Sequence, residues 1–401
     1  MLEIYDKAHQ QVPIKAWVGK KDDLEQGCLH QARNLSTLSF VHKWVALMPD
    51  THQGYGMPIG GVAALIDHVI PNAVGVDIGC GMAFTHTNIP LVALTDEISE
   101  LLIKRIMEEI PLGFSHHKEK QESEILKKYL DESEYDFSRI GHLYPEIEAS
   151  WYQLGTLGGG NHFIEIQADE NDELGIMIHS GSRNFGYKVA NYFNEKAKVY
   201  CKKHGGGQAA KYQLSYLKVD SLSGQDYLNW MTLALRFARE NRRIMMEKVQ
   251  AIVSDVFSNV EFEETINAHH NYASLEEHFG KEVWVHRKGA IRADKGVLGI
   301  IPGAMGNPSY IVRGLGCDES FRSCSHGAGR HMSRKAAIKA FKKDDVIKDL
   351  QEKGIHVGAP KKSVLTDESR FAYKDIAEVM KQQTDLAEIV KSLRTRLVVK
   401  G

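Results

Sequence analysis

The sequence predicts an α+β fold, and three observations support this prediction. In the first 90 residues, strand-like apolar runs alternate with glycine-containing turns. Residues 186–260 have a mostly helical pattern, and the strand-like pattern then returns over 283–301. No Pro/Ser-rich linker marks a boundary, and 401 residues suffice for a large core. We therefore expect one domain over residues 1–401, with a helical insertion over 186–260.

The individual elements follow from the spacing of apolar residues. The expected strands are 44–48, 61–66, 83–87, 174–178, 283–286, 297–301 and the tail 396–401. The expected helical segments are 93–133, 227–256, 330–341 and 373–383. Within the first helical segment, the residues predicted to share one face are Ile98, Leu101, Leu102 and Ile106.

Composition excludes several classes of protein. The N-terminus has neither a basic region nor an apolar run, so we expect no signal peptide, and no stretch is apolar enough for a membrane helix. Five cysteines, an odd and small number, are typical of a reducing compartment, so we expect the cytoplasm. The net charge of −2 argues weakly against a nucleic-acid partner.

The charge is unevenly distributed, however. Residues 281–340 hold 11 basic and 4 acidic side chains. This excess is either a solvated face or a surface for polyphosphate or a nucleic-acid backbone. The basic residues that suggest such a surface are Arg287, Lys288, Arg292, Arg313, Arg322 and Arg330.

Five separated segments place His, Cys, Asp or Arg side chains between glycines. They are residues 48–56, 75–81, 158–165, 179–183 and 325–330. Glycine lets the backbone approach a ligand closely or adopt φ > 0, at an entropic cost that an ordinary loop avoids. The repeated pairing indicates one composite site, and hence an enzyme.

Two of these segments suggest a metal site. Asp77 and Cys80 are three residues apart in a glycine-rich loop, and a carboxylate beside a thiolate suits Mn, Fe or Zn. With His162, His179 and the pair 269–270, the set is large enough for two metal ions about 3.5 to 4 Å apart. The alternative is a small buried cysteine with structural histidines.

His326 lies in Ser-His-Gly-Ala-Gly-Arg, just before a helix expected to begin near Arg330. A helix N-terminus attracts phosphate, and an imidazole there can act as a base, a metal ligand or a covalent phosphoryl acceptor. The alternative is a histidine that only fixes a glycine turn. There is no Walker loop, Rossmann fingerprint, C-x-x-C or G-x-S-x-G motif.

Together these segments resemble the RtcB family of RNA ligases. The matching stretches, in the order of the family, are 48–61, 75–81, 155–165, 179–183, 269–272 and 325–330, and the likeness extends through 372–375 to the terminal Val-Val-Lys-Gly. The resemblance implies one large domain of mixed sheets around a metal and GTP cleft. It also implies a reaction: RNA with a 2′,3′-cyclic phosphate or 3′-phosphate is joined to RNA with a 5′-hydroxyl, using GTP and Mn²⁺.

The resemblance also implies the roles of individual residues. His326 would form a histidyl-guanylate, with Asp50 orienting it. The implied metal ligands are Asp77, Cys80 (bridging two ions), His162, His179 and His270. The residues implied to contact GTP are Asn161, Glu165, Tyr373 and Lys400, and Arg183 would hold RNA phosphate.

One position departs from the family pattern. The family loop Pro-Gly-Ser-Met-Gly has Ala304 in place of serine here, which removes a hydroxyl contact plausible for nucleotide phosphate, worth about 0.5 to 1.5 kcal/mol. Two alternatives remain open at this point: a metal-dependent phosphoesterase or nuclease without guanylation, and a non-catalytic RNA-binding protein. The natural RNA, the oligomeric state and any archease-like activating partner are not determined by the sequence.

Overall fold

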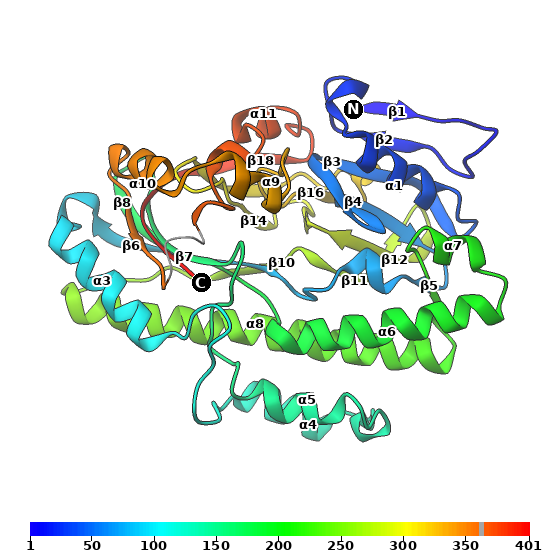
Figure 1. Ribbon diagram of the computed structural model, residues 1–401, viewed down its shortest axis with the longest axis horizontal. Helices are drawn as coiled ribbons and strands as arrows, with labels where there is room; N and C mark the ends of the chain where they lie inside the picture. Colours follow the sequence, from blue (N-terminus) through cyan, green and yellow to red (C-terminus); the bar gives the residue numbers. More distant parts are fainter. Residues whose placement is uncertain (361–364) are drawn as a thin grey trace.

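The computed structural model describes residues 1–360 and 365–401, and it contains two large sheets lined on one side by long helices (Figure 1). The first sheet has the order β1 (Leu2–Ile4), β2 (Ile14–Ala16), β3 (Val41–Tyr55), β4 (Met57–Leu65), β12 (Lys281–Lys288) and β11 (Asn271–His278). The second has the order β10 (Ile266–His269), β6 (Gly81–Pro90), β8 (Glu173–Ser180), β7 (Phe163–Ala168), β18 (Ala387–Lys400), β15 (Ser309–Gly314) and β14 (Leu298–Ile301), and β17 (His356–Gly358) pairs with β18. Two small sheets pair β13 (Ala290–Arg292) with β16 (Ser323–Ser325) and β5 (His68–Val69) with β9 (Leu217–Lys218).

The helices fall into three groups. Those beneath the sheets in Figure 1 are α6 (Arg183–Lys203) and α8 (Leu222–Val256), with α4 (Glu124–Glu132) and α5 (Tyr144–Ser150) lying beyond them, and the short helices α2 (Pro71–Val74) and α7 (Gly207–Lys211) contact α6. Those at the sheet edges are α1 (Gln26–Ser36) and α3 (Asp96–Glu109). The third group follows β16 and comprises α9 (Arg334–Ala340), α10 (Lys343–Glu352) and α11 (Ile376–Lys381). Among the described residues, we find no helix with the length and apolar character needed to cross a membrane.

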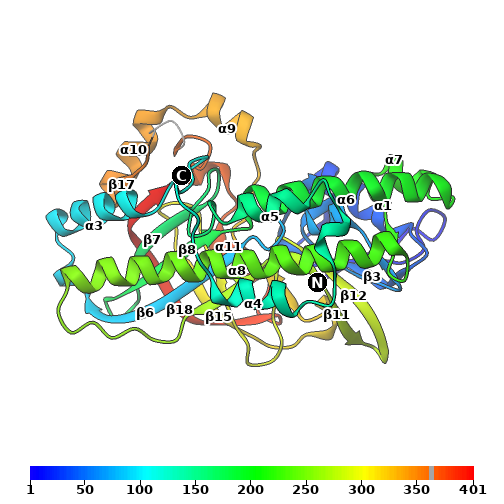
Figure 2. The ribbon, with the colours of Figure 1, turned by 90° about the horizontal axis from the view of Figure 1, so that it is seen from below.

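This architecture confirms the α+β class. Each predicted strand falls on an observed one, although β3 and β18 are much longer than predicted. The helical region predicted at 186–260 corresponds to α6, α7 and α8. Figure 2 shows α6 and α8 running side by side along the molecule.

The helical region predicted over 93–133 contains two helices. It is divided into α3 and α4 by the irregular segment 110–123, because Pro111 cannot continue a helix and Gly113 adopts φ +63°. The predicted apolar face of α3 is partly wrong. Leu102 and Ile106 are buried, whereas Leu101 is 44% exposed, because a step of one residue turns the side chain about 100° around the helix.

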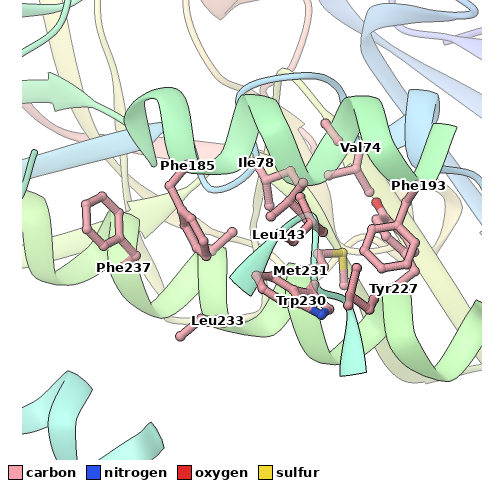
Figure 3. Packing of buried hydrophobic residues seen from close by; sticks show 14 of the residues in the cluster. Val74, Ile78, Leu143, Phe185, Phe193, Tyr227, Trp230, Met231, Leu233 and Phe237 are labelled. Carbon is pink, nitrogen blue, oxygen red and sulfur yellow. The ribbon is translucent and has the colours of Figure 1, made fainter. Parts of the chain in front are cut away.

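Aromatic side chains fill the space between α6 and α8 (Figure 3). Phe193 of α6 contacts Tyr227 of α8, with ring centroids 5.3 Å apart, and Phe185 lies 5.7 Å from Phe237. These rings are buried and pack edge to face or tilted, the arrangement that the aromatic quadrupole favours. The packing fixes α8 against α6 and, through it, against the sheet that carries the site.

Replacing Phe193 with alanine should therefore destabilise the protein by about 3 to 5 kcal/mol, through lost burial and a residual cavity. The measurement is the free energy of unfolding from denaturant titration. The matched control is Val199→Ala, an exposed position on the same helix, which should change that free energy by less than about 0.5 kcal/mol. Equal effects at the two positions would contradict this account of the core.

Candidate active site

Strand pairing brings three distant segments together around His179. This residue lies on β8, between β6 and β7, and is opposite Met82 of β6 and Phe163 of β7. Cys80 comes two residues before Met82, and His162 one residue before Phe163. The register of two antiparallel pairs therefore delivers both side chains to the end of β8.

The resulting cluster has the distances of a metal centre. Cys80 Sγ lies 3.2 Å from His179 Nε2 and 3.5 Å from His162 Nε2. Asp77 Oδ2 lies 3.1 Å from His162 Nε2. His179 Nδ1 donates to the carbonyl oxygen of Asn161 at 3.0 Å, which leaves Nε2 unprotonated and directed at Cys80. One thiol and two imidazoles are ligands that suit a divalent transition metal.

The electrostatics of the cluster fit a bound cation. Asp77 Oδ1 is buried with no hydrogen-bond partner among the described residues. Burial, reinforced by neighbouring histidines, lowers the pKa of His179 and His270 well below the usual value, so both are neutral, the form that binds metal. Burial and the Asp77 carboxylate raise the pKa of the Cys80 thiol, an effect that a divalent cation opposes.

His270 links this cluster to His326. Its ring centroid lies 5.2 Å from that of His179 and 4.8 Å from that of His326. Its backbone N–H donates to the carbonyl oxygen of Cys80 at 2.8 Å, which fixes it beside the thiol. His269 instead faces away, with Nδ1 3.1 Å from the carbonyl oxygen of Gly79. Of the two adjacent histidines, His270 is the one in the cluster.

His326 is paired with Asp50 from β3 of the other sheet. His326 Nδ1 lies 2.7 Å from Asp50 Oδ2, which also accepts from the backbone N–H groups of His326 and Gly327 at 3.1 and 3.2 Å. Burial alone would raise the pKa of Asp50, but the adjacent His326 outweighs it and lowers that pKa. A carboxylate beside Nδ1 favours the tautomer of His326 that carries its proton there, which leaves the lone pair on Nε2.

A cavity of about 200 Å³ opens in front of this pair. It is lined by residues from both sheets and from the region after β16. The predicted site residues in its wall are Asn161, Glu165, His179, His270, Ala304, His326, Tyr373 and Lys400. The predicted site residues that do not line this cavity are Asp50, Asp77, Cys80, His162 and Arg183. Asp50 contacts His326 and Cys80 contacts His179, and both of these histidines line the cavity. Asp77 contacts His162, which lies between the lining residues Asn161 and Phe163.

The wall of the cavity also contains buried charged residues. Burial raises the pKa of Glu165 to about 7, although Thr395 and Gln167 donate hydrogen bonds to it. Lys400 is 1% exposed, and its Nζ lies 3.9 Å from Glu368 Oε2. Tyr373 donates its hydroxyl to Glu368 at 2.6 Å. These groups can form directional hydrogen bonds to a planar polar ligand.

Glu368 is a residue that sequence reasoning missed. Besides Tyr373 and Lys400, it contacts Arg330 at 3.4 Å and Arg334 at 2.7 Å. It is buried, and the four surrounding donors or cations lower its pKa against the opposing effect of burial. An isolated Glu in the stretch 365–370 carries no motif, so only its three-dimensional surroundings identify it.

Arg183 lies at the first position of α6, beyond the metal cluster. Its Nε donates to Thr156 Oγ1 at 3.0 Å and its Nη2 to the carbonyl oxygen of Gly113 at 2.6 Å. Burial lowers its pKa, and nearby Asp77 acts in the opposite direction. Its φ is +57°, a left-handed conformation that a non-glycine residue rarely adopts. The cation is thus positioned beside the site through neutral partners.

The sequence of this chain is similar to those of a known protein family. The sequence profile described as tRNA-splicing ligase RtcB matches residues 31–401. The chain belongs to the RtcB family. It is 39% identical to the RNA-splicing ligase RtcB1 of Escherichia coli (strain ATCC 25922), over 98% of each chain. It is 34% identical to the tRNA-splicing ligase RtcB of Nanoarchaeum equitans, over 100% of this chain and 97% of that one. As a member of this family, the protein is a ligase.

In this RtcB chain, the expectation that His326 lies at a helix N-terminus is wrong. The helix α9 begins at Arg334, and Ser333 caps it by accepting from the backbone N–H of Ala336 at 3.2 Å. The loop before it is instead held by Gly329, where a Cβ would collide with the carbonyl oxygen of Asp50. His326 therefore owes its position to Asp50 and not to a helix dipole.

The six basic residues noted within 281–340 each have an acidic or carbonyl partner. The pairs are Arg287–Glu276, Arg292–Asp294, Arg313–Glu388, Arg322–Asp318 and Arg330–Glu368, and Lys288 donates to the carbonyl oxygens of Tyr55 and Asn72. Asp294 and Asp318 belong to the same stretch, whereas the other partners lie outside it.

A second His/acid cluster lies outside the active site, formed by His86, Asp169 and Glu173. Lys391 Nζ lies 3.0 Å from Asp169 Oδ2 and already supplies a cation there. This cluster is therefore a satisfied ion-pair network on the second sheet.

Two buried polar residues of α8 hold the loops of the RtcB site. Arg242 Nη1 donates to the carbonyl oxygens of Gly79 and Ser180 at 2.8 and 2.9 Å. Asn241 accepts from the backbone N–H of Gly155 at 2.7 Å and donates to the carbonyl oxygen of Gly181 at 3.1 Å. Both are fully buried. The sequence signal was an adjacent Asn-Arg pair inside an otherwise apolar helix face.

Replacing Arg242 with methionine removes the donor to the buried carbonyl oxygen of Ser180, whereas that of Gly79 still has His269 Nδ1 at 3.1 Å. We expect a loss of about 1 to 3 kcal/mol in the free energy of unfolding for the unpaired group, together with weaker divalent-cation binding. Denaturant titration and calorimetric titration with Mn²⁺ measure the two effects. Arg239→Met, at an exposed position three residues earlier, is the matched control. Unchanged Mn²⁺ affinity in Arg242→Met would show that the contacts do not organise the cluster.

Buried histidines should make stability depend on pH. Burial lowers the pKa of His52 to about 4, of His269 to about 3 and of His286 to about 4. Between these values and about 6.5, the unfolded chain binds protons that the folded chain does not. Stability should therefore fall as the pH drops from about 7 towards 4, by about 1.4 kcal/mol per pH unit for each such histidine.

Unfolding free energies measured over this pH range check the prediction. His286→Gln removes one of these groups away from the metal cluster, and it should flatten the dependence by about 1.4 kcal/mol per pH unit. His30→Gln, on the exposed face of α1, is the matched control. An unchanged slope in His286→Gln would contradict the assignment.

Proposed function

We propose that the protein joins an RNA ending in a 2′,3′-cyclic phosphate or 3′-phosphate to an RNA with a 5′-hydroxyl, using GTP through a histidyl-guanylate on His326. The observation that carries the proposal is the His326–Asp50 pair, at 2.7 Å, beside a cavity next to a Cys/His cluster. The names of the relatives, which describe RNA- and tRNA-splicing ligases, support RNA as the substrate.

In the first step, Nε2 of His326 attacks the α-phosphorus of GTP. A P–N bond forms, the P–O bond to pyrophosphate breaks, and pyrophosphate leaves. Asp50 keeps the proton on Nδ1 and stabilises the positive charge that develops on the ring. The guanylate then passes to the RNA 3′-phosphate. Finally, the 5′-hydroxyl attacks that phosphate, forms the phosphodiester and displaces GMP.

The residues that would hold two Mn²⁺ ions are Asp77, Cys80, His162, His179 and His270. The ions would neutralise the negative charge that accumulates on the transferring phosphate. The neutral imidazoles and the unpartnered Asp77 Oδ1 support this ligand set.

The part of the cavity wall with Glu165, Tyr373 and Lys400 would bind guanine, and the part with Asn161 and Ala304 would bind phosphate. Glu165 would accept from the guanine N–H groups, Lys400 would donate to its carbonyl oxygen, and Tyr373 would stack on the ring. Asn161 and the Ala304 loop would lie along the phosphates, the latter without the family hydroxyl. Their common position in the cavity wall supports this assignment.

Arg183 would bind RNA phosphate, and its guanidinium beside the metal cluster supports this role. We also place the protein in the cytoplasm, which its five free cysteines support. We also include an archease-like activating partner in this proposal, and reconstitution of the reaction with such a protein tests it.

His326→Ala should abolish formation of a protein–GMP adduct, by at least about 10³-fold, because no other group on the cavity wall is activated in the same way. The assay is incubation with α-labelled GTP and Mn²⁺, followed by a denaturing gel and intact mass. The adduct should be acid-labile and alkali-stable, as a phosphoramidate is. His331→Ala, at an exposed position five residues away, should retain the adduct. If wild-type protein with bound metal forms no adduct, a metal-dependent phosphoesterase or nuclease becomes the better reading.

A further inference from the structure

The loop between α3 and α4 carries the most exposed large hydrophobic side chain of the described residues. Phe114 has a relative accessibility of 104%. Its loop is nevertheless fixed: Gly113 N–H donates to the carbonyl oxygen of Gly158 at 3.1 Å, and His117 N–H donates to that of Tyr152 at 2.9 Å. A single exposed apolar residue has no meaning by itself, so its surroundings decide its interpretation.

This loop borders the active site. Arg183 Nη2 donates to the carbonyl oxygen of Gly113, the residue before Phe114. A Cβ on Gly158 would collide with both Arg183 and His162, so these two side chains flank the same glycine. In Figure 1 the cyan segment after α3 passes beside the C-terminus, whose Gly401 also packs on Gly158. The loop that carries Phe114 therefore contacts Gly158, which lies beside His162 of the metal cluster.

Cations with neutral partners lie along this loop. Lys248 of α8 has its Nζ 3.5 Å from His117 Nε2. Burial lowers the pKa of both groups; Glu109 acts in the opposite direction on each. Arg183 donates to Thr156 and to a backbone carbonyl. Since an ammonium group has three N–H donors, Lys248 can bind an anion while it contacts His117.

The chemistry of this surface favours a nucleic-acid strand. The exposed neighbours of Phe114 along the chain are Ser115, His116, Lys118, Glu119 and Lys120, which are polar and include two lysines and one glutamate. The His116 ring lies 6.3 Å from that of Tyr152. A projecting aromatic ring beside cations is the arrangement by which proteins bind single strands: bases stack and phosphates pair.

We propose that a nucleobase of the RNA strand that enters beside Arg183 stacks on Phe114, and that Lys248 and His117 bind the phosphodiester next to it. The identity of the ligand as RNA rests on the proposed function. The contact itself requires binding alone, without guanylation or ligation.

Affinity for an unreactive RNA, with hydroxyls at both ends, tests the stacking contact by fluorescence anisotropy. Phe114→Ala should weaken binding roughly 5- to 150-fold, and Phe114→Trp should retain it. A single abasic nucleotide, moved along the strand, should weaken wild-type binding at one position and have no effect there in Phe114→Ala. Val92→Ala, also highly exposed, is the control for loss of an exposed apolar side chain.

The phosphate contact is tested by salt dependence. Lys248→Gln should reduce the slope of log affinity against log salt concentration by about 0.7, the value for one phosphate on a single strand. Lys104→Gln, on the exposed face of α3, should leave it unchanged. Equal affinities of wild type and Phe114→Ala, with no position-specific abasic effect, would overturn the proposal.

The two proposals fail in different ways. Phe114→Ala should form the GMP adduct as wild type does, because that reaction contains no RNA. If wild type forms no adduct but shows the abasic pattern, the ligation mechanism falls and the RNA contact stands. If the adduct forms and the abasic pattern is missing, the RNA contact at Phe114 falls and the guanylation step stands.

Discussion

The site depends on buried hydrogen bonds between α8 and the main chain of the metal-cluster loops. Arg242 and Asn241 donate to carbonyl oxygens of Gly79, Ser180 and Gly181, segments about 100 residues apart in sequence. Burial lowers the pKa of Arg242 to about 10, while Cys80 and Asp77 act to raise it. A buried cation is costly without compensation, and here main-chain oxygens and the Asp77 carboxylate provide it. The aromatic packing between α6 and α8 supports the helix from which both residues project.

The catalytic groups come from both sheets. The first sheet supplies Asp50, and the second supplies His179 and the loops around it. His270 lies between them, with its ring near those of both His179 and His326. A site of this kind joins a nucleophile to a charge-neutralising cluster only when the two sheets pack in one relative position. Glycine is also needed where the loops beside the second sheet approach closely, as at Gly181, whose Cβ would collide with the Asp77 carboxylate.

Much of this arrangement could be predicted from the sequence. Apolar periodicity located the strands and the long helix α8, because burial on one face imposes that periodicity. The glycine-bounded motifs identified Cys80, His179 and His326 as candidates. The sequence could not reveal the contacts of Glu368 or the Arg313–Glu388 pair, because these contacts join remote segments. It misplaced the start of α9, because the periodic pattern does not distinguish Arg330 from the capping Ser333. Roles such as guanine recognition came from the family resemblance alone.

The central claim is that Cys80 and the surrounding histidines form a metal centre beside His326 that is independent of the nucleophile. Titration of the purified protein with Co²⁺, followed by absorption spectroscopy, tests it most directly. The account predicts a thiolate-to-cobalt charge-transfer band that saturates in wild type, persists in His326→Ala and disappears in Cys80→Ser. A band that survives in Cys80→Ser, or stoichiometric Co²⁺ binding by wild type without such a band, would contradict it.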